Sequence, residues 1–382
     1  MMNTNTQPLF SLTLYATFSL LLLFTLPNPT HQQSNQTADD NPRLEKAYIA
    51  LQAWKDAMTS DPNNFTANWV GPDVCSYEGV YCAPSLDNAD VTTVAGVDLN
   101  HANIAGTIPE EVGSLLTDLA VLHLNSNRFF GKIPDTFSEL TILFELDLSN
   151  NKFCGELPPV LFTLNTLKFL DVRFNHFDGA IPPDVFKLKL DALFLNDNNF
   201  STYSPGSVGN SPVSVMVMAN NNLNRCFPPR IARMNRTLDE VILANCGLTG
   251  CLPDNIGELN RTKVFDISFN SLTGKLPKSI GKMKAVEQLD VSHNEFYGDI
   301  PSTVCSLPKL ENFTYSHNYF CTEAPQCLEL KDQDDTFNCI RHRPLQRSRA
   351  ECRDFLSSPP KCSSFTCGTS PPPPPPYSPP SY

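Results

Sequence analysis

The chain has 382 residues, with 28 basic and 40 acidic side chains and a formal net charge of −12. An acidic surface repels the phosphates of nucleic acid, so a nucleic-acid partner is excluded and a cationic one is favoured. The same acidity equally fits a protein that only needs to stay soluble. The 13 cysteines indicate an oxidising compartment and several disulfides.

The amino end carries an apolar run from Leu9 to Leu26. It predicts a secretory signal peptide over residues 1–26, although no Lys or Arg precedes the run, which leaves a retained membrane anchor as the alternative. No later stretch has the roughly 20 apolar residues of a membrane span. Six Asn-x-Ser/Thr sites are candidates for N-glycosylation and agree with export to the extracellular space: Asn35, Asn64, Asn199, Asn235, Asn260 and Asn312.

Residues 44–90 are predicted to form an amino-terminal cap. Leu44–Met58 has apolar residues at helical spacing, and Ser60-Asp61-Pro62 ends the helix. We expect a disulfide between Cys75 and Cys82 to close the cap, because a zinc site, the alternative, would have too few ligands here. A cap is needed because the first unit of a stacked repeat would otherwise expose its core.

A motif such as LDLSNNKFCGELP, at Leu146–Pro158, recurs ten times within residues 91–327. Its alternating leucines predict a short strand with both leucines facing inward, and its asparagine turns inward to satisfy backbone groups of the bend. Steps of 23 to 25 residues separate the copies of this position, which we place at Asn103, Asn127, Asn151, Asn175, Asn198, Asn221, Cys246, Asn270, Asn294 and Asn318.

This pattern is that of the leucine-rich repeat, and the frequent Gly-x-Leu/Ile-Pro ending resembles its plant-specific subclass. The sequence therefore predicts an α/β fold. We expect a right-handed leucine-rich repeat solenoid of ten plant-type repeats with a curved parallel sheet, a helical disulfide-closed cap before it and a cysteine-rich segment after it.

Three consecutive repeats carry apolar residues where a strand side chain should face outward: Phe194, Val217 and Ile242, flanked by Phe169, Val215 and Val264. A solvated strand usually alternates apolar inside with polar outside, so this predicts a protein-contact patch on the concave side. A register slip of one residue would instead turn these side chains inward, but the asparagine positions fix the register.

Acidic residues flank that patch on the same strands: Glu145, Asp147, Asp171, Glu240, Asp266 and Asp290. Together the two sets predict a peptide-binding groove with an apolar floor and a negative rim, suited to a basic peptide with an aromatic or aliphatic anchor. The alternative is that these aspartates and glutamates are only solvated residues, which are common at this position.

The cysteines of the repeats suggest one further disulfide. Cys226 and Cys251 each follow the asparagine position of their repeat by five residues, so stacking would place them about 5 Å apart, near the separation that a disulfide prefers. We therefore expect a Cys226–Cys251 disulfide, with Cys246 left as a buried thiol. Cys154 and Cys321 have no evident partner, and either could link two chains into a homodimer.

Beyond the repeats, residues 328–367 are rich in cysteine and arginine, and residues 368–382 form a short proline-rich tail with six consecutive prolines. Little apolar periodicity is present in the first part, so disulfides should supply its order. The proline run favours an extended polyproline II rod. Tyrosines in the tail suggest a role beyond that of a linker.

Several of these segments resemble plant leucine-rich repeat extensins. Asn338–Ser348, Glu351-Cys352 and Cys362–Cys367 are similar to the cysteine-rich hinge of that family, and the Ser-Pro end is similar to the start of its extensin region. The resemblance implies a secreted cell-wall protein that binds basic, cysteine-containing peptide hormones of the rapid alkalinization factor class and joins wall polymers, either pectin or the extensin network. It also implies a modified or crosslinked tail, through Ser370, Pro371, Tyr377 and Tyr382.

An enzymatic function finds no support in the sequence. No catalytic triad, metal-ligand spacing or phosphate loop is present, so we expect no enzyme, no cofactor and no metal. Histidines 101, 123, 176, 293 and 317 are scattered over turns and outward positions and are interpreted as solvated. The alternative function is inhibition of a secreted pectin-degrading enzyme, because polygalacturonase-inhibiting proteins are also ten-repeat solenoids of this subclass; they lack the hinge and the proline-rich tail.

Overall fold

The computed structural model describes residues 41–365. Several predictions lie outside these residues: the signal peptide, and the sites at Asn35, Ser370, Pro371, Tyr377 and Tyr382. Within residues 41–365, no helix combines the length and hydrophobicity needed to cross a bilayer.

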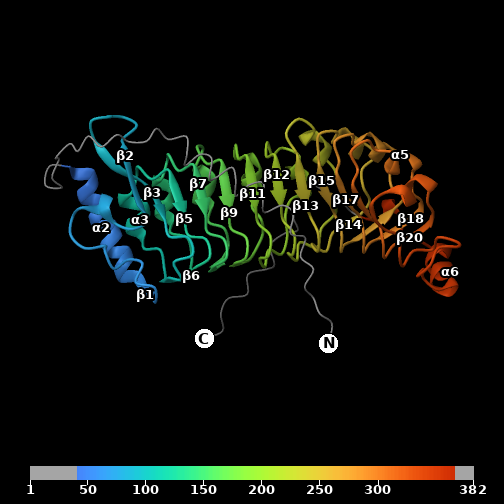
Figure 1. The fold of residues 1–382 in the computed structure, drawn as a ribbon, viewed down its shortest axis with the longest axis horizontal. Helices are drawn as coiled ribbons and strands as arrows, with labels where there is room; N and C mark the ends of the chain where they lie inside the picture. The colour runs from blue at the N-terminus through green and yellow to red at the C-terminus, as the bar shows by residue number, and fades with distance from the viewer. Residues whose placement is uncertain (1–40, 366–382) are drawn as a thin grey trace. The chain divides into compact units, whose positions relative to one another are not determined.

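One sheet runs along the described unit, with neighbouring repeats contributing neighbouring strands (Figure 1). Strand β2 (Val80–Pro84) pairs antiparallel with β3 (Thr92–Asp98), and every later pairing in this sheet is parallel. The other strands are β5 (Val121–His123), β7 (Glu145–Asp147), β9 (Phe169–Asp171), β11 (Ala192–Phe194), β12 (Val215–Val217), β13 (Glu240–Ile242), β15 (Val264–Asp266), β17 (Gln288–Asp290), β19 (Asn312–Thr314) and β21 (Asp332–Asp334).

Two further groups of strands form a second layer after the turns. One group contains β1 (Met58–Ser60), β4 (Ala105–Gly106), β6 (Arg128–Gly131), β8 (Lys152–Gly155) and β10 (His176–Phe177). The other contains β14 (Thr249–Gly250), β16 (Ser271–Gly274), β18 (Glu295–Asp299) and β20 (Tyr319–Thr322).

Helices return the chain from one repeat to the next. The α-helices are α2 (Pro42–Ala57), α3 (Glu110–Leu115), α4 (Pro205–Val208), α5 (Ser302–Cys305) and α6 (Arg349–Ser357). The 3-10 helices are Val74–Ser76, Asp135–Glu139, Pro159–Thr163, Pro183–Lys187, Ile231–Met234, Ile256–Glu258, Lys278–Lys282, Pro325–Glu329 and Cys362–Ser364.

The inward asparagines hold successive turns together, as predicted. Asn151 donates from Nδ2 to the carbonyls of Leu124, Leu148 and Ser149 at 2.8, 3.2 and 3.0 Å, and its Oδ1 accepts from the Phe129 amide at 2.9 Å. Each such side chain satisfies backbone groups that no strand reaches. The same arrangement recurs at Asn127, Asn175, Asn198, Asn221, Asn294 and Asn318.

Two repeats differ from the predicted assignment. In the first, the register pairs Val97 with Leu122, which puts the buried Ala102 in the asparagine position and leaves Asn103 exposed. The placement at Asn103 was wrong by one residue, because the register makes the step from Ala102 to Asn127 25 residues, where the prediction assumed 24. After the tenth repeat, β21 and Asn338 add an eleventh: Asn338 donates to the Tyr315 carbonyl at 3.1 Å and accepts from the Phe320 amide. The predicted hinge segment therefore begins with a further repeat.

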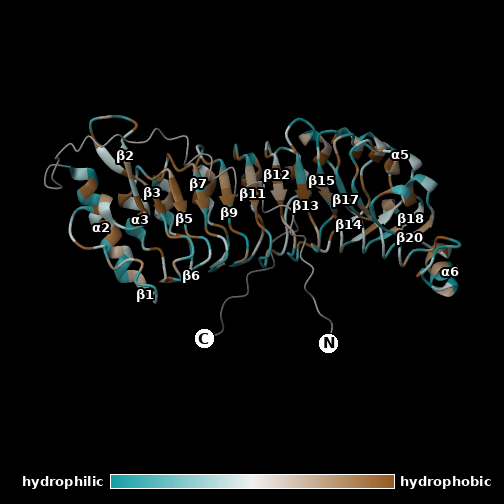
Figure 2. Cartoon of the chain, in the orientation of Figure 1, coloured by the Kyte–Doolittle hydropathy of each residue, from teal (hydrophilic) through white to brown (hydrophobic). Residues whose placement is uncertain are grey.

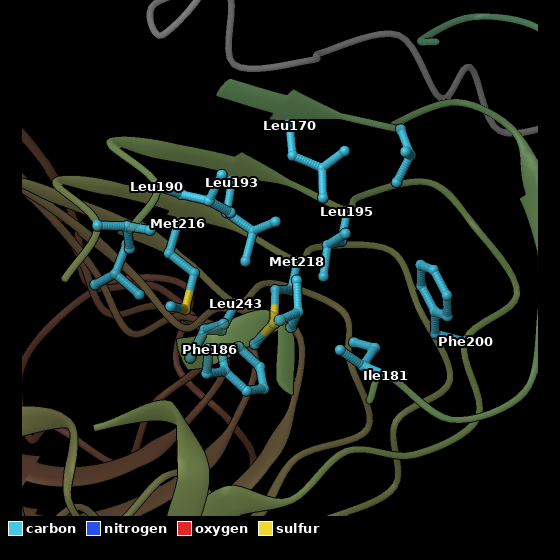
Figure 3. Close-up of a cluster of buried hydrophobic side chains, with 14 of the residues drawn as sticks. Leu170, Ile181, Phe186, Leu190, Leu193, Leu195, Phe200, Met216, Met218 and Leu243 are labelled. Carbon is cyan, nitrogen blue, oxygen red and sulfur yellow. The ribbon is translucent and has the colours of Figure 1, made fainter. Parts of the chain in front are cut away.

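The core is continuous from one repeat to the next. In the middle repeats Leu193, Leu195, Met216, Met218 and Phe186 gather in one cluster and are fully buried (Figure 3). Hydrophobic colouring follows the strands β7, β9 and β11 of the main sheet (Figure 2). Stacking neighbours thus bury the apolar edge that a single repeat would expose.

The disulfides confirm the pairing predicted in the cap and contradict the one predicted in the repeats. Cys75 and Cys82 are bonded, as predicted. Cys251 bonds Cys362 instead of Cys226, and Cys226 is itself disulfide-bonded elsewhere. The predicted Cys226–Cys251 pairing was wrong because the residue stacked on Cys226 is Thr249, which leaves Cys251 two residues out of register.

The remaining cysteines divide into bonded and free ones. Cys305 bonds Cys327, and Cys339 bonds Cys352. Gly274 leaves room for the Cys251–Cys362 bond, since a Cβ there would lie 2.9 Å from the Cys251 sulfur and the backbone has φ +91°. Cys246 is a buried free thiol, as expected, and Cys154 and Cys321 are also free.

Candidate binding surface on the main sheet

Each strand of the main sheet sends its middle residue into the core and its first and last residues to the opposite face. Register aligns the first residues into one row and the last residues into a second. The first row runs Glu145, Phe169, Ala192, Val215, Glu240, Val264 and Gln288. The second runs Asp147, Asp171, Phe194, Val217, Ile242, Asp266 and Asp290.

The six predicted apolar residues therefore lie on adjoining strands in the two outward rows. Phe169 and Phe194 have ring centroids 5.7 Å apart, and the Arg173 guanidinium lies 4.9 Å from the Phe194 centroid. Ala192, which the sequence reasoning missed, completes the set. We call Phe169, Ala192, Phe194, Val215, Val217, Ile242 and Val264 the apolar patch.

The middle of the apolar patch is less accessible than an open surface would be. Phe194 is 4% exposed and Val217 is 7% exposed, while Phe169, Ile242 and Val264 are half-buried. A partner reaching this face would therefore meet mainly these three half-buried side chains. Arg173 was not among the predicted residues, because its contact with Phe194 crosses between strands and leaves no pattern along the chain.

On the amino-terminal side of the patch, the acidic residues pair with basic ones. Asp171 is fully buried, which raises its pKa well above the usual range, and the nearby charge of Asp147 adds to that rise. Its Oδ2 lies 3.0 Å from the Arg173 Nε. Glu145 contacts the His123 ring at 3.0 Å and, although burial opposes it, raises the pKa of that imidazole.

On the carboxyl-terminal side, Asp266 and Asp290 are adjacent in the second row. Burial raises the pKa of both carboxyls, and for Asp290 burial together with the charge of Asp266 raises it to about 7. Each accepts a hydrogen bond from the backbone of the serine two residues on, Ser268 at 2.9 Å and Ser292 at 2.8 Å. The two sides of the patch thus carry acidic groups, but with different neighbours.

The predicted glycosylation sites lie mostly at the surface. Asn64, Asn199, Asn260 and Asn312 are exposed, and Asn235 is half-buried. Asn312 begins β19 and lies in the first outward row next to Gln288, so a glycan there would limit the extent of any partner on this face. None of the described residues forms a group of three or more His, Cys, Asp or Glu side chains able to hold a metal ion.

The comparisons with known proteins agree with this architecture. A sequence profile described as "Leucine rich repeat N-terminal domain" matches residues 47–83, and one described as "Leucine Rich Repeat" matches residues 118–140, 143–164, 261–283 and 285–307. Among solved structures, the receptor kinase HAESA of Arabidopsis, in complex with the peptide hormone IDA and the co-receptor SERK1, is similar with a TM-score of 0.68 and 28% identity over 77% of this chain and 50% of that chain.

A plant ice-binding protein is also similar, with a TM-score of 0.65 and 25% identity over 80% of this chain and 98% of that one. Closer relatives come from Arabidopsis thaliana. "Leucine-rich repeat extensin-like protein 6" is 65% identical over 86% of this chain and 70% of its own length. "Leucine-rich repeat extensin-like protein 4" is 65% identical over 87% of this chain and 67% of its own length. The chain belongs to the leucine-rich repeat extensin-like family.

Proposed function

We propose that the outward face of the main sheet binds a basic, cysteine-containing signalling peptide of the rapid alkalinization factor class, and that the protein holds this peptide at the cell wall. The observation that carries the proposal is the apolar patch between acidic residues on both sides, Asp147 on one and Asp266 and Asp290 on the other. Such an arrangement suits a cationic partner with an apolar anchor, because charge guides the encounter and apolar contact supplies affinity.

The relatives support two parts of this proposal. The extensin-like name of the relatives supports a place in the wall, and the related HAESA ectodomain was crystallised with a peptide hormone. The ice-binding protein has the same fold and a different role, so the fold alone does not decide the function. Support for peptide binding therefore comes from the residues of this sheet.

The alternative, inhibition of a secreted pectin-degrading enzyme, is less well supported. That function would use the same fold without the cysteine-rich hinge. Here α6 of the hinge stacks on the last repeats, with Phe355 and Tyr319 ring centroids 3.6 Å apart, and two disulfides hold the segment: Cys339–Cys352 and Cys251–Cys362. A hinge bound this firmly fits an extensin-like protein better than a free-standing inhibitor.

The central test replaces Phe169 and Ile242 by Asp, because these patch residues are half-buried and tolerate a charge better than Phe194. We expect each variant to lose about 10-fold or more in affinity for a synthetic basic peptide of the class, measured by calorimetry. Leu86→Asp is the matched control, since Leu86 is 84% exposed and lies on the cap. Unchanged affinity in both patch variants would place the peptide elsewhere.

The identity of the partner can be tested without choosing a peptide. The repeats with their hinge would be immobilised and exposed to a wall extract, in parallel with the Ile242→Asp variant. Basic cysteine-containing peptides retained by the wild type alone would support the proposal. Retention of a glycosidase alone would favour the inhibitor function.

The wall attachment is tested separately. Removing residues 371–382 should leave peptide affinity unchanged and let salt extract the protein from walls. Equal retention of the full-length and shortened proteins would show that the tail is not an anchor.

A further inference from the structure

A further row of side chains lies in the turns that follow the strands of the main sheet. The residue just before the asparagine position has a left-handed backbone in every repeat. In five repeats it is a small or polar residue that suits this conformation: Ser126, Asn150, Asp197, Asn220 and Asn245. In two others it is a ring with a small or polar residue at this position in the adjacent repeats: His101 and Phe174. In the last four repeats it is an aromatic one: Phe269, His293, His317 and Phe337, with φ between 51° and 56°.

These four rings stack into one column, which we call the aromatic ladder. The centroid distances are 4.0 Å from Phe269 to His293, 3.9 Å from His293 to His317 and 4.4 Å from His317 to Phe337. Phe269 remains 54% exposed and Phe337 46% exposed. The turn itself does not require rings here, because Asn and Ser make the same turn in other repeats and a bulky residue is unfavourable at positive φ. An exposed aromatic column that the fold does not need is a candidate contact surface.

An acidic row, interrupted by Thr314 on β19, ends the strands that precede the aromatic ladder. Asp266, Asp290 and Asp334 each lie three residues before a ladder residue. The residue two beyond each aspartate donates its backbone N–H to the carboxylate: Ser268, Ser292 and Thr336, at 2.9, 2.8 and 3.0 Å. The chain between the acidic row and the rings contains Ser268, Ser292 and Ser316. These serines are small and buried, so they do not project between the carboxylates and the rings.

The acidic row and the aromatic ladder together favour binding of a planar cation. Carboxylates attract a positive charge, and phenyl faces accept it through the cation–π interaction. A guanidinium can stack on a ring and donate to a carboxylate at once, whereas an ammonium group is a compact, strongly hydrated charge. We propose that the acidic row and the aromatic ladder together form an arginine-binding strip, on which an arginine-containing extended segment of the peptide docks beside the apolar patch. The identity of that peptide rests on the proposed function.

The pKa values of the histidines in the strip also favour binding of a cation. Burial, with the neighbouring His317, lowers the pKa of His293 to about 4, and burial lowers the pKa of His317 as well. Asp334 opposes both of these shifts, and Arg347 adds to both. His293 is therefore neutral above about pH 5, the lowered pKa of His317 keeps its imidazole neutral at pH 7.5, and neither ring repels a cation there. Acidification protonates Asp290, whose pKa is about 7, and later charges the imidazoles, so both changes weaken cation binding.

The test uses octa-arginine and octa-lysine as probes on the full secreted chain at pH 7.5 and fixed salt. Wild type should bind octa-arginine about fivefold more tightly than octa-lysine, the size of an exposed cation–π contact. Phe269→Leu with Phe337→Leu keeps the apolar volume without the rings and should remove this preference. Phe174→Leu is the matched control, because Phe174 occupies the same turn position with φ 53° and is 41% exposed, outside the ladder.

A second variant addresses the acidic row. Asp266→Asn with Asp290→Asn should weaken both probes and flatten the salt dependence and the pH dependence of binding between pH 7.5 and 5. Near-ultraviolet circular dichroism checks that each variant is folded. Equal wild-type affinity for the two probes, or a preference that survives the double leucine variant, would overturn the proposal.

The same probes separate this inference from the proposed function. Phe169→Asp should weaken binding of the basic cysteine-containing peptide yet leave octa-arginine binding unchanged, because β11, β12 and β13 separate Phe169 on β9 from Asp266 on β15. If Phe269→Leu with Phe337→Leu loses the arginine preference but keeps its affinity for the basic peptide, the peptide does not bind the strip. The apolar patch would then remain its proposed site.

Discussion

At the amino end of the repeats, α2 buries Ala47, Ala50, Leu51 and Trp54, whereas at the carboxyl end α6 buries none of its residues. Trp54 and Trp69 are fully buried and contact each other edge to face, with centroids 6.5 Å apart. Apolar packing thus closes one end of the solenoid.

The carboxyl end uses covalent and surface contacts instead. A capping box between Ser348 and Glu351 begins α6, Cys352 of that helix bonds Cys339, and Phe355 stacks on Tyr319. Both ends contain a disulfide, Cys75–Cys82 at the amino end and Cys339–Cys352 at the carboxyl end, but only the amino end adds a buried apolar core. A helix without buried residues relies on its disulfides for order. If the two ends differ in energy as they differ in construction, changes at each end should have effects of different size.

The largest effect is expected at the amino end. Trp54→Ala should lower the free energy of unfolding by about 3–5 kcal/mol, because it removes a fully buried ring and leaves a cavity. Guanidinium denaturation measures this loss. Ile49→Ala on the same helix is the control, since Ile49 is 49% exposed and should change stability by less than about 1 kcal/mol. Equal effects would mean that the cap is loosely packed.

Removing a disulfide at the carboxyl end should act locally. Cys251→Ser with Cys362→Ser should speed tryptic cleavage at Arg353 and Lys361 by about 10-fold, because local opening becomes easier without the link. The melting temperature of the repeats should change little. A large fall in that temperature would show that the hinge also stabilises the repeats.

A smaller effect concerns the sheet next to the hinge. Asp290 has a raised pKa of about 7 in the folded protein, so folding takes up a proton between about pH 4 and 7. Its contribution to stability is therefore present at low pH and is lost as the pH rises through 7. The melting temperature should fall more between pH 5 and 8 for wild type than for Asp290→Asn. Parallel profiles would contradict the raised pKa.

The smallest effect is a difference in thiol labelling. Burial raises the pKa of Cys246 to about 12, which alone slows its reaction at pH 8 by roughly 1,000-fold relative to an ordinary thiol. The exposed Cys154 should therefore react with a maleimide first. In the Cys251→Ser, Cys362→Ser variant, Cys321 on β20 should label faster while Cys246 does not. Faster labelling of Cys246 would mean that opening spreads into the repeats.

Much of the fold could be predicted from the sequence, because the asparagine and leucine positions repeat with a nearly fixed period. The same regularity predicted the outward direction of Phe194, Val217 and Ile242, and it identified Cys246 as a buried thiol. These features depend only on residues a few positions apart or on equal positions in adjacent repeats.

The failures have different physical causes. The eleventh repeat follows the tenth by 20 residues at its asparagine, from Asn318 to Asn338, and has Gln333 where a leucine is expected. Beyond the turns, each repeat pairs with the next at an offset of two residues, as Cys154 does with His176, so Cys226 faces Thr249. The Cys251–Cys362 bond spans 111 residues and follows from how the hinge folds back, which no local pattern encodes.

That bond also determines how the molecule would carry tension. Tension on Cys362 passes through its disulfide to Cys251, which lies in the seventh repeat. The pull therefore passes to the middle of the solenoid through a covalent link and bypasses the last four repeats. The arginine-binding strip lies on those repeats, so tension on the hinge at Cys362 leaves this surface undistorted.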